Sequence, residues 1–129
     1  MLELEKQPVI NYDKRLKSEV AKTLLKIGMP VNVLGFTYLK DILYIIIREN
    51  RTLKGITTYL YPKIAEAHNT TPEAVERTIR NCIEKMYKSG LEWLSDFFEG
   101  RYFDKKEILT NSAFIGLLAE KIRANLNLY

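Results

Sequence analysis

Apolar side chains recur every three or four residues from Asp13 onward, which is the period of an amphipathic α-helix. The positions that carry this period are Leu16, Val20, Leu24 and Ile27. The pattern stops at Gly28 and Pro30, a pair typical of a helix end because Gly accepts the left-handed conformation and Pro cannot continue the hydrogen-bond ladder. Residues 1–11 show no sustained period. We therefore expect a tail over residues 1–11, followed by a first helix.

The stretch over residues 36–50 supports two interpretations. Three consecutive isoleucines, Ile45 to Ile47, favour a strand by propensity. Leu39 and Leu43, interleaved with charged residues, favour a helix. We predict a buried central helix.

The next segment carries the clearest helix signals in the chain. Pro62 suits the first turn of a short helix that ends near His68. After a turn of a few residues, Thr71 is a good N-cap, and Pro72 and Glu73 favour the first turn of a longer helix. Gly90 predicts the end of that helix, so we expect it over residues 71–89.

Two further helices are predicted towards the C-terminus. Residues 91–100 resemble a short aromatic-rich helix stopped at Gly100, and residues 110–126 form a last helix with Phe114, Leu118 and Ile122 on its inner stripe. The aromatic residues Trp93, Phe97 and Phe98 are more typical of core packing than of an exposed partner-binding stripe. The prediction is an all-α, six-helix bundle that forms one domain over residues 12–129.

Composition is that of an ordinary globular protein. The chain has 129 residues, 47% hydrophobic and 28% charged, and a net charge of +4 that permits a polyanionic partner without requiring one. One cysteine, Cys82, and one histidine, His68, exclude an internal disulfide and a zinc site built from these residue types. We expect no metal and no cofactor.

Other function classes find little support in the chain. No glycine-rich phosphate loop and no nucleophile paired with a base is evident, so an enzyme with a small-molecule substrate is not expected. The N-terminal residues are too charged for a signal peptide, and the longest apolar run, 42–47, is too short to cross a bilayer. We expect a cytoplasmic protein that does not engage a membrane.

A short helix, a tight turn and a longer helix form a helix-turn-helix, here over residues 62–88, whose second helix enters a DNA groove. The predicted outer face of the second helix presents Glu76, Arg77, Arg80, Asn81 and Glu84. Arginine pairs with guanine through two hydrogen bonds, asparagine pairs with adenine, and glutamate accepts from cytosine. The same spacing also fits a solvated face with internal ion pairs, and both interpretations remain open at this point.

From about Leu16 to Ile122 the sequence resembles the DNA-binding effector domain of stage 0 sporulation protein A, the master sporulation regulator of endospore-forming bacteria. The resemblance is carried by three segments in the same order and with nearly the same spacing: IGMPVNVLGFTYLKDIL, ITTYLYPKIAEAHNTTPEAVERTIRNCIE and TNSAFIGLLAEKIR. It implies a six-helix fold whose fourth helix recognises a short DNA box. Glu76, Arg77 and Arg80 would then face bases, with Asn81 beside them.

Phosphate contacts are expected from the turn, from the start of the recognition helix and from nearby lysines. The candidates are Thr70, Thr71, Glu73, Lys63, Lys105 and Lys106. The sequence departs from the family at several places: Asn81 replaces a common histidine, Ala74 replaces a basic residue, and Glu66 and Ala67 replace lysines. These changes predict an altered preference at the flank of the box and a weaker affinity.

The resemblance also implies an N-terminal receiver domain, which residues 1–11 are too few to hold, so we expect either an excised or a stand-alone effector domain. Taken together, the chain is predicted to be a sequence-specific transcription regulator of sporulation that binds double-stranded DNA. The resemblance implies contact with RNA polymerase and pairing of two copies on tandem boxes. The alternative is a non-enzymatic interaction protein that pairs with a full-length sporulation regulator without useful DNA binding of its own.

Overall fold

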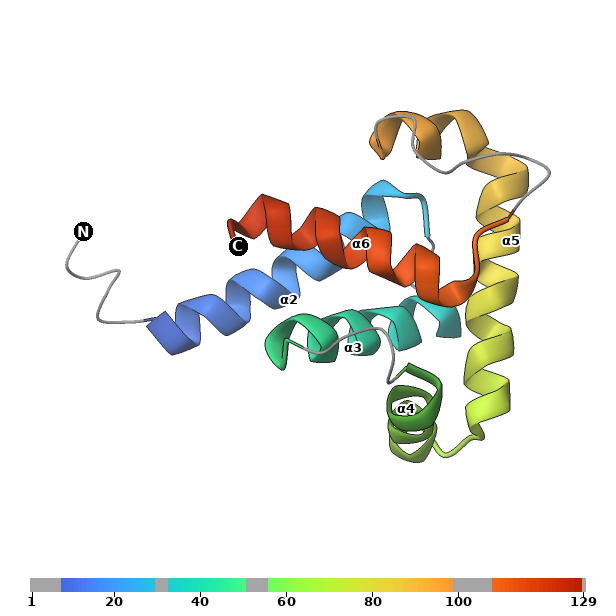
Figure 1. The fold of residues 1–129 in the computed structure, drawn as a ribbon, viewed down its shortest axis with the longest axis horizontal. Coiled ribbons are helices and arrows are strands. Elements are labelled where there is room, and N and C mark those ends of the chain that lie inside the picture. The colour runs from blue at the N-terminus through green and yellow to red at the C-terminus, as the bar shows by residue number, and fades with distance from the viewer. Residues whose placement is uncertain (1–7, 30–32, 51–55, 99–107, 129) are drawn as a thin grey trace.

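The computed structural model describes residues 8–29, 33–50, 56–98 and 108–128, and all of its regular structure there is helical. The described ranges contain five α-helices, which we label as in Figure 1. In chain order the described elements are α2 (Pro8–Lys26), α3 (Leu34–Arg48), a π-helical turn η2 (Ile56–Leu60), α4 (Tyr61–Ala67), α5 (Pro72–Phe97) and α6 (Asn111–Leu126). The predicted all-α class is confirmed.

The first helix starts earlier than expected but ends where predicted. α2 begins at Pro8, so residues 8–11 are helical although their sequence lacks a clear apolar period. Pro8 suits the first helical position because its missing amide has no intrahelical partner there. At the other end Gly28 has φ 84°, and the Met29 amide donates to the Leu24 carbonyl at 3.1 Å. This left-handed end is the reason for a glycine at that position.

α3 is a helix, as predicted, and it lies at the centre of the molecule. It contacts α2, α4, α5 and α6. Ile42 and Ile46 are buried on successive turns, whereas Ile45 is only half-buried. A helix in contact with four neighbours is apolar over much of its circumference, which is why its sequence resembles that of a buried strand.

The prediction that Gly90 ends the fourth helix is wrong. α5 runs without interruption from Pro72 to Phe97, so residues 91–97 continue it instead of forming a separate helix. Five α-helices, not six, therefore lie within the described ranges. Figure 1 shows the last part of α5 turning across the end of the bundle. Glycine costs only about 1 kcal/mol in a helix interior, so burial of an apolar side chain beyond it can offset that cost.

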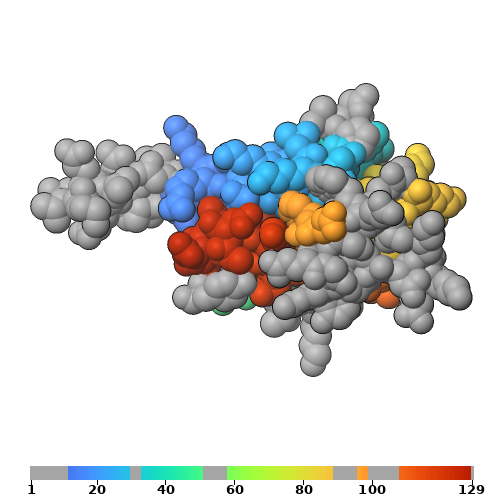
Figure 2. Space-filling view, turned by 90° about the horizontal axis from the view of Figure 1, so that it is seen from above, coloured from blue at the N-terminus to red at the C-terminus, as the bar shows by residue number. Residues whose placement is uncertain are grey.

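The buried core joins the two ends of the chain. Phe114, Leu118 and Ile122 of α6 are each 0% exposed, as the predicted inner stripe requires. α2 and α6 pack side by side and form one surface of the molecule (Figure 2). Phe98 is buried beside Phe114, with 6.3 Å between the ring centroids.

Within the described part of the chain, no helix is both long enough and apolar enough to cross a membrane.

Candidate nucleic-acid interface

The turn between α4 and α5 has a defined geometry. Asn69 adopts the left-handed conformation with φ 57°, the Thr70 amide donates to the Ala65 carbonyl at 2.9 Å, and the Asn69 amide donates to the Glu66 carbonyl at 3.4 Å. This pair of bonds is the Schellman arrangement that closes a helix end. It ends α4 and sets the direction in which α5 begins.

The start of α5 is capped as the sequence predicts. Thr71 Oγ1 accepts a hydrogen bond from the Ala74 amide at 3.1 Å. Pro72 follows as the first helical residue and Glu73 lies in the first turn. The cap satisfies one of the amides that a helix start leaves without an intrahelical acceptor.

Packing decides which face of α5 meets solvent. Val75 and Ile79 are 0% exposed and Ile83 is 1% exposed, because this stripe packs into the core. The opposite face presents Arg77, Arg80 and Asn81 as exposed side chains, with Glu76 and Glu84 half-buried at its edge. The structure therefore brings the four predicted base-contacting residues together on one outward face.

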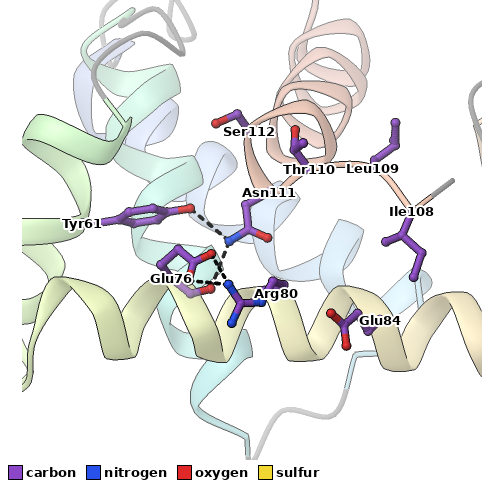
Figure 3. A pocket seen from close by; sticks show the side chains of 9 residues that line it. All are labelled: Tyr61, Glu76, Arg80, Glu84, Ile108, Leu109, Thr110, Asn111 and Ser112. Atoms are coloured by element: carbon purple, nitrogen blue, oxygen red, sulfur yellow. Dashed lines mark hydrogen bonds and ion pairs between the residues drawn. The ribbon is translucent and has the colours of Figure 1, made fainter.

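Arg80 is not isolated on this face. Its Nη1 atom lies 2.7 Å from Glu76 Oε1 and 2.9 Å from Glu76 Oε2, one helical turn away (Figure 3). Both side chains are partly exposed, at 49% and 36%, so water screens the pair. Both bonds use Nη1, so Nε and Nη2 do not take part in this ion pair.

Arg77 differs from Arg80 in its surroundings. It is exposed, and no ion pair or side-chain hydrogen bond joins it to another described residue. Its guanidinium can therefore reorient towards a partner without first breaking such a contact. Arg77 is the better placed of the two arginines for a new contact.

The predicted phosphate contacts are only partly available. The Thr70 amide is bonded to Ala65, and the Thr71 hydroxyl serves as the cap of α5. The Glu73 amide occupies a position without an intrahelical acceptor. Lys63 donates to Tyr59 Oη at 3.0 Å and lies 3.8 Å from Glu49 Oε2. Lys105 and Lys106 lie outside the described residues.

The structure adds two residues, Asn111 and Tyr61, that the sequence did not indicate. Asn111, the first residue of α6, donates from Nδ2 to the Glu76 carbonyl at 3.0 Å and to Tyr61 Oη at 3.1 Å (Figure 3). These partners lie 35 and 50 residues away in the chain. No local pattern could signal the contact. A groove of about 420 Å³ between α5 and the start of α6 adjoins them.

His68 has a structural role that the sequence left unassigned. Its Nε2 lies 2.9 Å from Asp41 Oδ2, and its ring meets that of Tyr38 edge to face at 5.2 Å. His68 is the C-cap residue of α4, whereas Asp41 and Tyr38 belong to α3. The contact therefore links the turn before α5 to the central helix α3.

Cys82 packs between α3 and α5. A side chain built on Gly35 would overlap the Cys82 Sγ atom, so α3 and α5 approach each other closely at this point. Burial raises the pKa of the Cys82 thiol, which disfavours the reactive thiolate. Cys82 is thus a spacer between two helices and has no feature of a reactive centre.

The charge around the outward face of α5 is only weakly basic. Residues 61–88 contain five basic and four acidic side chains, if His68 is neutral. The acidic members are Glu66, Glu73, Glu76 and Glu84. Any attraction of this surface to a polyanion must therefore come from a few well-placed cations and not from a broad positive field.

Residues 20–122 match the protein family described as "Sporulation initiation factor Spo0A C terminal". The matched range extends from α2 to α6 and includes the whole of α4 and α5. The turn, the capped helix start and the outward arginines all lie within it.

Proposed function

The chain belongs to the sporulation initiation factor Spo0A C-terminal family, and we propose that it is a sequence-specific regulator that reads a short DNA box with α5. The family consists of DNA-binding effector domains of a sporulation regulator and is not an enzyme family. The observation that carries the proposal is the outward face of α5, where two arginines and an asparagine are exposed beside a capped helix start.

In the proposed complex, α5 enters the major groove with its N-terminus first, as the second helix of a helix-turn-helix does. Arg77 reads a guanine through two donors. Arg80 reads a second guanine through Nε and Nη2, while Glu76 holds Nη1 and limits the rotation of the guanidinium. Asn81 and the Glu76 carboxylate contact neighbouring bases.

The ion pair between Glu76 and Arg80 does not prevent this role. An exposed pair at this helical spacing contributes about 0.3 to 0.5 kcal/mol. A bidentate contact between arginine and the correct base discriminates against the wrong base by about 1 to 3 kcal/mol. The preference for the correct base is thus larger than the ion pair's contribution, even if the pair must be loosened on binding.

The turn and the first turn of α5 are proposed to position the duplex through phosphate contacts. The Glu73 amide and the positive end of the helix dipole are the components best suited to an anion. Thr70, Thr71 and Lys63 would contribute side-chain contacts, and Lys105 and Lys106 would reach the backbone from before α6. Such contacts fix register without reading sequence.

The decisive experiment is selection of a binding site with the purified chain, followed by fluorescence anisotropy on the selected duplex and a scrambled duplex. Arg77→Ala and Arg80→Ala should each weaken the selected duplex by about 1 to 3 kcal/mol and relax preference at one base pair. Arg15→Ala is the matched control because Arg15 is an exposed arginine of α2. Equal losses for Arg15→Ala and Arg77→Ala would contradict readout by α5.

The weakly basic surface favours a second candidate, an interaction protein that pairs with a full-length sporulation regulator and does not use DNA. Glu66 is exposed where family members carry a lysine, and Ala74 is half-buried at the start of α5. On this alternative the selected and scrambled duplexes bind equally weakly, and a pull-down retains the full-length regulator. The first measurement above therefore separates the two candidates.

The proposal extends to the setting in which the chain acts. Two copies would bind tandem boxes and contact RNA polymerase in the cytoplasm, as the family resemblance implies. Anisotropy on duplexes with one box and with two boxes tests the pairing. A higher affinity per box on the tandem duplex than on the single-box duplex supports pairing. Identical affinity per box on the two duplexes argues against pairing.

A further inference from the structure

Asn111 joins three helices through one side-chain nitrogen. Nδ2 carries two hydrogens, and it donates to the Glu76 carbonyl of α5 at 3.0 Å and to Tyr61 Oη of α4 at 3.1 Å. Asn111 itself is the first residue of α6. Tyr61 is only 4% exposed, so the contact sits against a rigid part of the core.

The carbonyl that Asn111 contacts belongs to the recognition turn, which we define as residues 76–80. In an α-helix this carbonyl already accepts the amide of the residue four positions later, here Arg80. The Asn111 bond uses its second lone pair and restrains the peptide group that directly precedes Arg77 and accepts the Arg80 amide. The bond comes from outside α4 and α5, so it restrains the turn relative to α6.

Asn111 is not needed to cap its own helix. Thr110 is the N-cap of α6, and its Oγ1 accepts the Ala113 amide at 3.2 Å. The side chain of Asn111 is therefore directed to the contacts with α4 and α5 (Figure 3). Its role at the groove is separable from the stability of the start of α6.

We propose that Asn111 is a positioning residue, which holds the recognition turn of α5 against α4 and α6 and so sets how well the chain distinguishes its DNA box from other sequences. The inference rests on the proposed reading of bases by Arg77 and Arg80. Side chains that read a ligand must be held within about 0.5 Å of their working geometry by the groups behind them. Asn111 is the described residue that supplies such a support from outside the helix-turn-helix.

Asn111→Asp tests the proposal because the substitution keeps the shape and removes the donor. The new carboxylate faces the Glu76 carbonyl, which it cannot hydrogen-bond. An acidic residue in the first turn of α6 is favourable for that helix, so the variant should remain folded. The matched control is Ser112→Asp, which adds the same charge one residue further along the same groove. Thermal unfolding verifies that both variants fold.

Two readouts are needed, one with DNA and one without. In anisotropy, Asn111→Asp should lower the ratio of selected-duplex to scrambled-duplex affinity about tenfold, because the Glu76 carbonyl loses its bond to Asn111, whereas the Tyr61 hydroxyl can still donate to the new carboxylate. Ser112→Asp should lower both affinities together and leave the ratio unchanged within about twofold. In hydrogen exchange on the free protein, amides of the recognition turn should exchange faster in Asn111→Asp than in Ser112→Asp.

The outcomes are distinguishable. If Asn111→Asp and Ser112→Asp give the same affinity ratio and the same exchange, the positioning role is overturned. If the unaltered chain shows no preference between duplexes, the proposed function fails, and the exchange readout alone decides whether Asn111 holds the recognition turn. Tyr61→Phe removes one of the two acceptors of Asn111. Its affinity ratio should lie between the ratios of the unaltered chain and of Asn111→Asp.

Discussion

The two faces of α5 lie on the same helix but in different physical surroundings. Val75, Ile79 and Ile83 have at most 1% of their surface exposed, whereas Arg77 and Arg80 are in solvent. Removal of a buried aliphatic side chain costs several kcal/mol, and an exposed substitution usually changes stability by less than about 0.5 kcal/mol. The inner face is therefore fixed by the need to fold, and the outer face is free to carry recognition.

The largest expected effect is on the inner face. Ile79→Ala should lower the free energy of unfolding by about 2 to 5 kcal/mol, because it leaves a cavity in a fully buried site. Arg77→Ala should change the same quantity by less than about 0.5 kcal/mol. Urea denaturation, monitored by circular dichroism, measures the free energy of unfolding of both variants. A loss of stability in Arg77→Ala as large as that in Ile79→Ala would remove the distinction between the faces.

An intermediate effect is expected where α5 meets α3. Gly35→Ala should destabilise the protein by about 1 to 3 kcal/mol, because the added methyl group would overlap Cys82 Sγ. In the double variant with Cys82→Ala the sulfur is gone, and the nearest atom becomes the Cβ of residue 82 at 3.2 Å. The double variant should therefore recover much of the loss. Additive losses in this double-mutant cycle would contradict the close approach.

A smaller loss of stability is expected where both faces begin, at the N-cap of α5. Thr71→Ala removes the acceptor of the Ala74 amide and should cost about 1 kcal/mol of stability. Thr78→Ala, within the same helix and without a capping role, is the control and should be close to neutral. The midpoint of thermal unfolding compares the two variants. Equal shifts would show that Thr71 does not act as a cap.

Much of the fold was predictable because the core is built from helical stripes. The stripes of the first and last helices, such as Leu16 and Phe114, are buried as their spacing indicates. The capping residue Thr71 and the left-handed Gly28 lie where local chemistry places them. The two errors, the start of α2 and the predicted break at Gly90, concern helix ends that local propensity specifies weakly.

The candidate site was predictable in its residue types but not in its partners. The spacing of Glu76 and Arg80 suggested both a base-reading face and an internal ion pair, and the structure shows the pair. The support from Asn111 and the tie between His68 and Asp41 join segments far apart in the chain. Neither contact follows from a local pattern, because a helical period specifies a face but not the residue that meets it.

The sequence by itself determined that this protein is helical, where the turn between α4 and α5 lies, and which side chains of α5 face outward. Those features depend on contacts within a few residues, where helical periodicity and capping operate. Only the tertiary structure decided that α5 continues through Gly90, that Gly35 admits Cys82, and that Asn111 reaches the Glu76 carbonyl. These are outcomes of packing between distant segments, whose geometry exists only once the whole core has formed.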